Sequence, residues 1–132
     1  MRSPAKNGLF KQIGGGSHIQ NLALRGTMTC ASSTSGGSVV GYAYGKNIVI
    51  ENCFSYVTVT GSGRNVGGIV GYAPAKTSVI NCLNEADVTA KTCAAGVAGK
   101  AQASVANATG AKNAPAIKNC GNTGTITATD AK

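Results

Sequence analysis

The sequence predicts an all-β protein, a parallel β-solenoid (β-helix) of about four three-stranded coils with roughly 30 residues in each coil. The main observation is a repeated pattern of Ile or Val, any residue, and Asn, with a Thr eight positions after the Asn. Its four copies end in Asn21 and Thr29, Asn52 and Thr60, Asn81 and Thr89, and Asn119 and Thr127. Self-similarity at this period is typical of stacked structural repeats rather than of one irregular globule. The composition and the alternation of side chains agree with this prediction.

The composition fits a thin stack better than a compact core. The chain has 132 residues, of which 19 are Gly and only 5% are aromatic. A solenoid needs only small and β-branched interior side chains, because each coil covers its neighbours. The length corresponds to a single domain over residues 1–132. Gly and β-branched residues interrupt the windows that could be helical, so strands are the expected structure.

Each repeat is expected to contain three strand-like segments. The first is Gly-rich, the second contains the Asn and usually a Cys, and the third alternates Thr with an apolar residue. Alternation with a period of two marks the third segment as a half-buried strand. Its predicted inward side chains are Met28, Val59, Val88 and Ile126. Its predicted outward Thr residues are Thr27, Thr29, Thr58, Thr60, Thr89, Thr125 and Thr127.

The predicted coils cover residues 8–37, 38–65, 66–92 and 93–129. The last coil is longer than the others, and its excess falls at residues 102–114, which are rich in Ala, Asn, Gly and Lys. We expect a loop insertion there, since insertions in repeat proteins lie in loops. Neither end of the sequence carries an amphipathic segment suited to cap a stack, so both solenoid ends are expected to be open.

Two columns of identical residues are expected along the stack, and both are interpreted as structural. Asn tolerates left-handed backbone where a strand meets a turn, and stacked Asn side chains can form an amide ladder. The predicted Asn ladder is Asn21, Asn52, Asn81 and Asn119. The predicted Cys ladder, directly after the Asn, is Cys53, Cys82 and Cys120. Because in-line side chains on parallel strands seldom reach disulfide geometry, these thiols are predicted to be reduced.

The remaining reactive residues suggest no catalytic, cofactor or metal site. Cys30 and Cys93 lie off the repeat frame and are predicted to be the exposed thiols. There is no Cys-x-x-Cys pair, and His18 is the only His, so no zinc set is expected. His18 has no obvious partner and is interpreted as a surface residue. The four acidic residues form no repeated pair of the kind that glycosidases use, and the chain is predicted not to be an enzyme.

The chain is basic, with a net charge of +8, but its Lys and Arg residues are scattered. Such a charge attracts anionic glycans, nucleic acid or lipid, and on β surfaces it also suppresses unwanted strand pairing. Nucleic acid is disfavoured as a partner, because the basic residues are not clustered with aromatic ones. No apolar stretch has the length of a membrane span, and no signal peptide is recognisable.

Three stretches of the chain carry a resemblance to a known repeat family. They are Val-Gly-Gly-Ile-Val-Gly-Tyr-Ala at 66–73, Val-Ile-Asn-Cys-Leu-Asn at 79–84, and Asn-Cys-Gly-Asn-Thr-Gly-Thr-Ile-Thr at 119–127. They resemble the GLUG-type repeat of large bacterial and some protist surface proteins, over about residues 8–127. The resemblance implies a parallel β-solenoid used as a spacer or adhesive stalk at the cell exterior, without catalytic residues. Lys11, Ala98 and Lys100 depart from the usual pattern.

Two functional hypotheses follow from the sequence. The first is a non-enzymatic structural or adhesive module of an extracellular or surface assembly. Two explanations of its open solenoid ends stay open, namely that the chain is cut from a longer array or that copies stack end to end into a homo-oligomer or filament. The second is an ice-binding or glycan-binding solenoid. It would use the Thr-x-Thr rows, which resemble those of β-solenoid antifreeze proteins, or Tyr42 and Tyr72 beside nearby Lys residues, with an anionic glycan as partner. Tyr42 and Tyr72 occupy equivalent repeat positions and are expected to stack.

Overall fold

The protein is all-β over the residues that the computed structural model describes, which are 8–30, 35–74, 76–102 and 116–130. Every regular element in these ranges is a strand, and the strands form three sheets in which each neighbouring pair is parallel. No helix in these ranges has the length and hydropathy needed to cross a membrane. The expectation of an all-β chain built from parallel sheets is confirmed.

The two smaller sheets are built from short strands that contain or border Gly. The four-stranded sheet has the order β1 (Phe10–Ile13), β4 (Val40–Ala43), β7 (Val70–Ala73) and β12 (Ala98–Ala101). The three-stranded sheet consists of β3 (Ser35–Gly37), β6 (Asn65–Gly67) and β11 (Ala94–Ala95). The sequence analysis did not separate this second set of strands from the Gly-rich segments that follow them.

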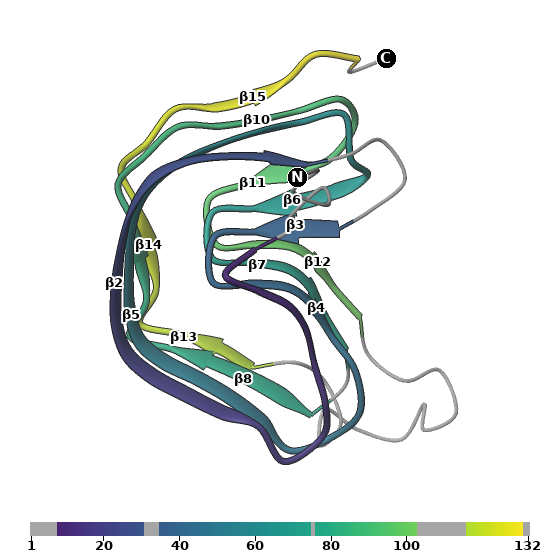
Figure 1. Ribbon diagram of the computed structural model, residues 1–132, viewed down its shortest axis with the longest axis vertical. Helices are drawn as coiled ribbons and strands as arrows, with labels where there is room; N and C mark the ends of the chain where they lie inside the picture. The colour runs from purple at the N-terminus through teal and green to yellow at the C-terminus, as the bar shows by residue number, and fades with distance from the viewer. Residues whose placement is uncertain (1–7, 31–34, 75, 103–115, 131–132) are drawn as a thin grey trace, which may run out of the picture.

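The largest sheet has eight strands and forms the long curved wall of the molecule (Figure 1). Two of its strands are long, β2 (His18–Cys30) and β5 (Ile48–Gly61). The six shorter ones are β8 (Thr77–Ile80), β9 (Leu83–Asn84), β10 (Val88–Ala90), β13 (Ala116–Lys118), β14 (Gly121–Asn122) and β15 (Ile126–Ala128). In Figure 1, β2 and β5 follow the same path one behind the other.

The second and third segments of each repeat were predicted as separate strands, and for the first two repeats this is wrong. The repeat Asn bends the chain without ending the strand, because its backbone is left-handed, with φ of 58° at Asn21 and 52° at Asn52. Asn81 and Asn119 share this conformation, but there the strand is interrupted, between β8 and β9 and between β13 and β14. Asn adopts such a backbone more readily than most residues do.

Pairing in all three sheets joins residues about one repeat apart. In the four-stranded sheet Phe10 pairs with Val40, Val40 with Val70, and Val70 with Ala98. In the eight-stranded sheet one row runs through Thr29, Thr60, Thr89 and Thr127. The register is therefore constant from one repeat to the next, so like residues form rows across the strands.

The core consists of small and β-branched side chains, as the composition suggested. Its largest fully buried members include Ile48, Ile50, Ile69, Val59 and Val79. The predicted inward residues Val59 and Val88 are fully buried, Met28 is half-buried, and Ile126 in β15 is 37% exposed. Ile126 differs because β15 has a described neighbour on one side only, β10.

Glycine lets the four-stranded and three-stranded sheets approach backbone to backbone. A methyl group at Gly71 would lie closer than 3.0 Å to the Gly41 carbonyl and to the backbone of Gly36. A methyl group at Gly67 would meet only backbone atoms, of Val70, Gly99 and Val97. Because backbone atoms cannot move aside as a flexible side chain can, these positions require Gly in the observed packing.

The predicted loop insertion at 102–114 lies outside the described residues apart from Gln102. The backbone nitrogen of Gln102 donates to the Ala73 carbonyl, and its side-chain Oε1 accepts a 3.0 Å hydrogen bond from the hydroxyl of Tyr72. The chain therefore stays joined to the preceding repeat up to the start of that segment.

Candidate functional site

Three of the four acidic side chains make structural contacts, each with a different partner. Glu51 lies 2.6 Å from Nε2 of His18, and Asp130 lies 3.4 Å from the Lys91 ammonium. Asp87 accepts a 2.8 Å hydrogen bond from the backbone nitrogen of Thr125. These contacts link neighbouring strands or the segments that follow them. The prediction that His18 has no partner is wrong, because the register of β2 and β5 brings Glu51 beside it.

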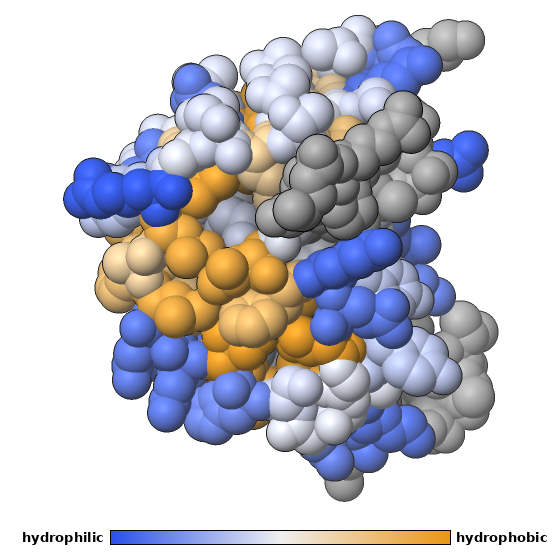
Figure 2. All heavy atoms as spheres, in the orientation of Figure 1, coloured by the Kyte–Doolittle hydropathy of each residue, from blue (hydrophilic) through white to orange (hydrophobic). Residues whose placement is uncertain are grey.

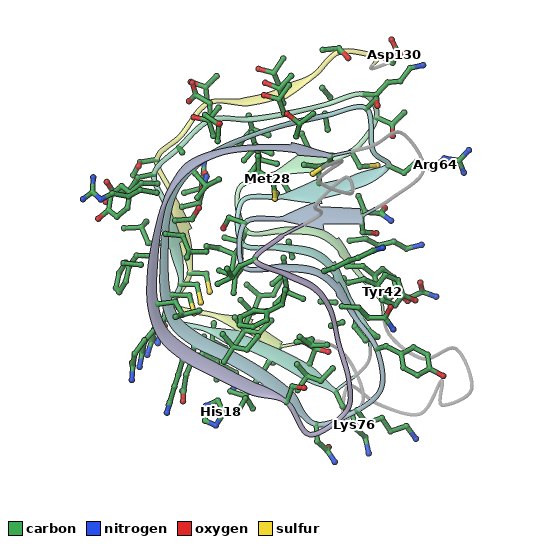
Figure 3. All side chains as sticks on the ribbon, viewed as in Figure 1. His18, Met28, Tyr42, Arg64, Lys76 and Asp130 are labelled. Atoms are coloured by element: carbon green, nitrogen blue, oxygen red, sulfur yellow. The ribbon has the colours of Figure 1, made fainter. Side chains whose placement is uncertain are left out.

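The described residues contain no cluster of three or more His, Cys, Asp or Glu side chains that could hold a metal ion. Glu85 and Asp87 both lie between β9 and β10, and both are exposed. His18 lies on the outer surface (Figure 3), and its partner Glu51 is half-buried.

The Asn ladder is formed over the first three repeats. Nδ2 of Asn52 donates to Oδ1 of Asn21 at 3.2 Å, and Nδ2 of Asn81 donates to Oδ1 of Asn52 at 3.3 Å. Each Asn therefore donates to the Asn of the preceding repeat. Asn119 has the same left-handed backbone, and its neighbour Lys118 accepts a backbone hydrogen bond from Asn81. The hydrogen bonds of this ladder all run from a later repeat to the preceding one.

A second ladder of Asn side chains was missed by the sequence analysis. Nδ2 of Asn84 donates to Oδ1 of Asn122 at 2.7 Å, and each of these Asn residues also donates to the carbonyl two positions ahead. Asn84 is fully buried. Its side chain fits because Gly68 lies opposite, where a methyl group would overlap it, and Gly96 lies opposite Asn122 in the same way. The signal was present in the sequence as an Asn two positions after Cys82 and Cys120.

The Cys column consists of free thiols that satisfy backbone groups. Cys53, Cys82 and Cys120 are not disulfide-bonded, and each donates from Sγ to the carbonyl two residues earlier at 3.2–3.3 Å. These carbonyls directly precede the left-handed Asn, where the ladder of strand hydrogen bonds is disturbed. The neighbouring thiol of Cys82 lowers the pKa of Cys53 to about 7, whereas the interaction with Cys53, together with burial, raises the pKa of Cys82. The contacts of these three thiols are with the protein backbone, as expected for a structural role.

Cys30 was predicted to be exposed, and this is wrong. The side chain is 2% exposed at the end of β2, where it packs with Val59, Val66 and Val88. Burial raises the pKa of Cys30 to about 11. Cys93, the other thiol off the repeat frame, is exposed as predicted. The difference arises because Cys30 continues the period-two alternation of β2, in which Met28 also faces inward.

Thiol labelling should separate the two residues. At pH 8 and under native conditions, Cys93 is expected to react rapidly with an aromatic disulfide reagent. Cys30, Cys53 and Cys82 should react only as the protein opens, because they are buried and a thiol inside the core is inaccessible. In a Cys120→Ser background, which removes the one half-buried thiol, Cys93→Ser should abolish the rapid phase, whereas Cys30→Ser should leave it intact. Rapid labelling that survives in Cys93→Ser and disappears in Cys30→Ser would contradict the structure.

The outward Thr residues form two neighbouring rows on the eight-stranded sheet. One row is Thr29, Thr60, Thr89 and Thr127. The other contains the pair Thr27 and Thr58, with Thr125 two positions before Thr127. All of these are exposed except Thr89, which is half-buried. Neighbours in a row are separated by about 4.8 Å and the two rows by about 7 Å, as strand geometry dictates. The result is a regular hydroxyl and methyl surface.

The two Tyr side chains stack on each other as predicted. The rings of Tyr42 and Tyr72 have centroids 4.7 Å apart and planes at 10°, and Tyr42 projects outward from the four-stranded sheet (Figure 3). Nζ of Lys100 lies 5.8 Å from the Tyr72 centroid, in the next strand of the same row. Burial, and to a lesser extent the neighbouring Tyr42, raise the pKa of Tyr72. The inner ring faces are therefore already covered, which leaves less aromatic surface for a sugar than the sequence suggested.

The end of the stack formed by β1 and β2 presents an apolar surface that the sequence analysis did not single out. Ile19, Leu22 and Leu24 are half-buried there and pack on the main core. Leu9 is 56% and Phe10 40% exposed. Figure 2 looks onto this end and shows a central hydrophobic area bordered by hydrophilic residues. Among the described strands, β1 and β2 have a neighbour on one side only.

No protein-family model matches the chain, and no curated protein or solved structure is similar enough to count as a match. The resemblance to the GLUG-type repeat therefore stays a prediction from the sequence.

Proposed function

We propose that this protein is a non-enzymatic structural module, a parallel β-solenoid of GLUG-type repeats that serves as a spacer or adhesive segment in an extracellular or cell-surface assembly. The observation that carries the proposal is the constant register of all three sheets. Residues of one repeat lie beside their equivalents in the next, as in the rows through Thr29 and Val70. Such pairing is what stacked windings around one axis produce.

The use of polar side chains supports the same proposal. The Asn and Cys columns bond to neighbouring repeats or to their own backbone, and Asp87 and Glu51 bridge between strands. Catalysis of glycoside hydrolysis would need two carboxyl groups facing one bond. The described acidic residues are instead distributed over separate contacts. These polar side chains thus support a role in holding neighbouring repeats together.

Single-molecule pulling on the two ends of the chain tests this proposal. Windings that lie on one another should peel off in turn, so we expect several extension steps of about 30 residues, roughly 100 Å each at full extension. Each step breaks the pairing between one repeat and the next. Release of the whole chain in one step of several hundred ångströms would contradict a module built of independent windings. A variant with Val79→Asp, in the buried core, should lower the force of its own step first.

A second candidate function is supported by one specific observation, the in-register Thr row of the eight-stranded sheet. Regularly spaced hydroxyl and methyl groups suit an ordered water layer, so the face could bind ice, or a glycan through its hydroxyl groups. Thermal hysteresis measured with the wild-type chain and with Thr60→Lys distinguishes the two cases. Activity that is lost in Thr60→Lys would favour ice binding, and no hysteresis in either chain would exclude it.

A further inference from the structure

The two ends of the stack of strands are unlike each other, and the difference concerns side-chain size. At the β1–β2 end the residues are large and apolar, including Phe10, Ile13, Leu22 and Leu24. Their row equivalents at the far end of the sheets are small or polar. In row order these equivalents are Ala98, Ala101, Cys120 and Asn122. The β1–β2 end therefore carries large side chains in rows where the far end carries small ones.

Two further rows match apolar residues with apolar residues at the two ends. Ile19 and Ile117 are the two ends of the row that runs through Ile50 and Val79. Met28 and Ile126 are the two ends of the row through Val59 and Val88. Ile117 is 43% and Ile126 37% exposed. Burying such side chains removes apolar surface from water, at roughly 25 cal/mol for each Å².

Charged residues at the two ends are not opposed in these rows. Lys118 belongs to the row that begins with Gln20, and Lys100 to the row that begins with Gln12. Arg25 begins a row whose second member is Tyr56. The guanidinium of Arg25 lies over the Tyr56 ring, 4.5 Å from the ring centroid. A chain with a net charge of +8 resists self-association in general. The rows of Lys100 and Lys118, however, place each of these two cations against an amide rather than against another cation.

The Asn ladder has one direction over the first three repeats. Asn52 donates from Nδ2 to Oδ1 of Asn21, and Asn81 donates to Asn52 in the same way. Oδ1 of Asn21 accepts from Asn52, which leaves the Nδ2 of Asn21 as the donor directed away from the second repeat. An incoming Asn21 placed after Asn119 would continue the donor-to-acceptor order without reversal. The same holds for the backbone, because all neighbouring strands are parallel.

From these matched rows we propose that the partner of the β1–β2 end is a second copy of this chain, bound head to tail through its β12–β15 end. The inference rests on the proposed solenoid and specifies its partner, polarity and register. Ile19 of one copy packs on Ile117 of the next, Met28 packs on Ile126, and Asn21 joins Asn119. Because this contact is heterologous and does not close, repetition gives a filament that advances by about 19 Å per copy, four strand spacings.

Two variants that each block one end provide the test. Ile19→Lys places a cation in the first end and leaves the second intact, and Ile117→Lys does the reverse. Under reducing conditions the wild-type chain should form filaments in electron micrographs and sediment as a concentration-dependent series. Each blocked variant alone should be monomeric. An equimolar mixture should give a 1:1 dimer and nothing larger, because only one pair of intact ends remains.

Controls separate interface effects from loss of fold. Circular dichroism of each variant should show the wild-type strand signal, and Tyr44→Lys, at a residue that is 65% exposed on the second repeat, should polymerise normally. In the double variant Ile19→Lys/Ile117→Asp the two new charges face each other across the contact, so filaments should return. Dimers formed by Ile117→Lys alone would overturn the proposal, because they would join like ends. A wild-type chain that stays monomeric at high concentration would overturn it too, while stepwise unravelling would still support the structural module.

Discussion

Replacing Gly71 by Ala should lower the free energy of unfolding by about 3 kcal/mol, because the added methyl group has no room. It would overlap the Gly41 carbonyl and the backbone of Gly36, where the four-stranded and three-stranded sheets touch. Relief would require the two sheets to separate, and this would loosen the pairing of β7 with β4 and β12. Since whole domains are stable by about 5–15 kcal/mol, the loss should be visible in any denaturant titration.

The matched control is Gly14→Ala. Gly14 has open space around the position of the added methyl group and does not have a left-handed backbone. Its replacement should change the free energy of unfolding by no more than about 0.5 kcal/mol. Equal stabilities of the two variants in urea, under reducing conditions, would show that the sheets do not approach as closely as the structure has them.

Replacing Ile50 by Ala should cost about 2–5 kcal/mol of stability, whereas Ile117→Ala should cost less than about 1 kcal/mol. The two residues belong to one row of the eight-stranded sheet and have the same side chain. Ile50 is fully buried between two neighbouring strands, while Ile117 in β13 has one described neighbour and is 43% exposed. The change removes the same atoms in both cases, so the difference measures how much each repeat is covered by the next.

This comparison must be made at a concentration at which the chain is monomeric. If copies stack through their ends, Ile117 gains a second neighbour, and Ile117→Ala should then destabilise the assembly more than the monomer. Chemical denaturation at two protein concentrations separates these contributions. Similar losses for both variants in the dilute chain would contradict the burial that the structure assigns to Ile50.

The rows of identical residues could be predicted because register is encoded locally. An Asn at a regular interval, with an apolar residue two positions before it, places the bend of every repeat at the same point. Parallel pairing then brings Asn21, Asn52 and Asn81 together. The stacking of Tyr42 on Tyr72 follows from the same rule. For residues at equivalent positions of successive repeats, the repeat spacing alone was enough to predict which side chains lie side by side.

Errors arose where the structure depends on contacts between different parts of a repeat. Cys30 lies outside the repeated motif, yet it is buried, because β2 runs on to the point where the three-stranded sheet covers it. His18 and Glu51 are far apart in the chain, and only the register of β2 with β5 joins them. The short strands β3, β6 and β11 carry too few residues to show an alternation of their own.

The sequence by itself determined that this chain is all-β and that its repeats place like residues in rows, since spacing and alternation depend on backbone geometry alone. Tertiary structure decided which of those residues are covered. Ile50 and Ile117 are residues of the same type, as are Gly71 and Gly14. The members of each pair differ in the atoms that lie next to them. Burial is a property of neighbours brought together by folding, and the free energy of each side chain follows from those neighbours.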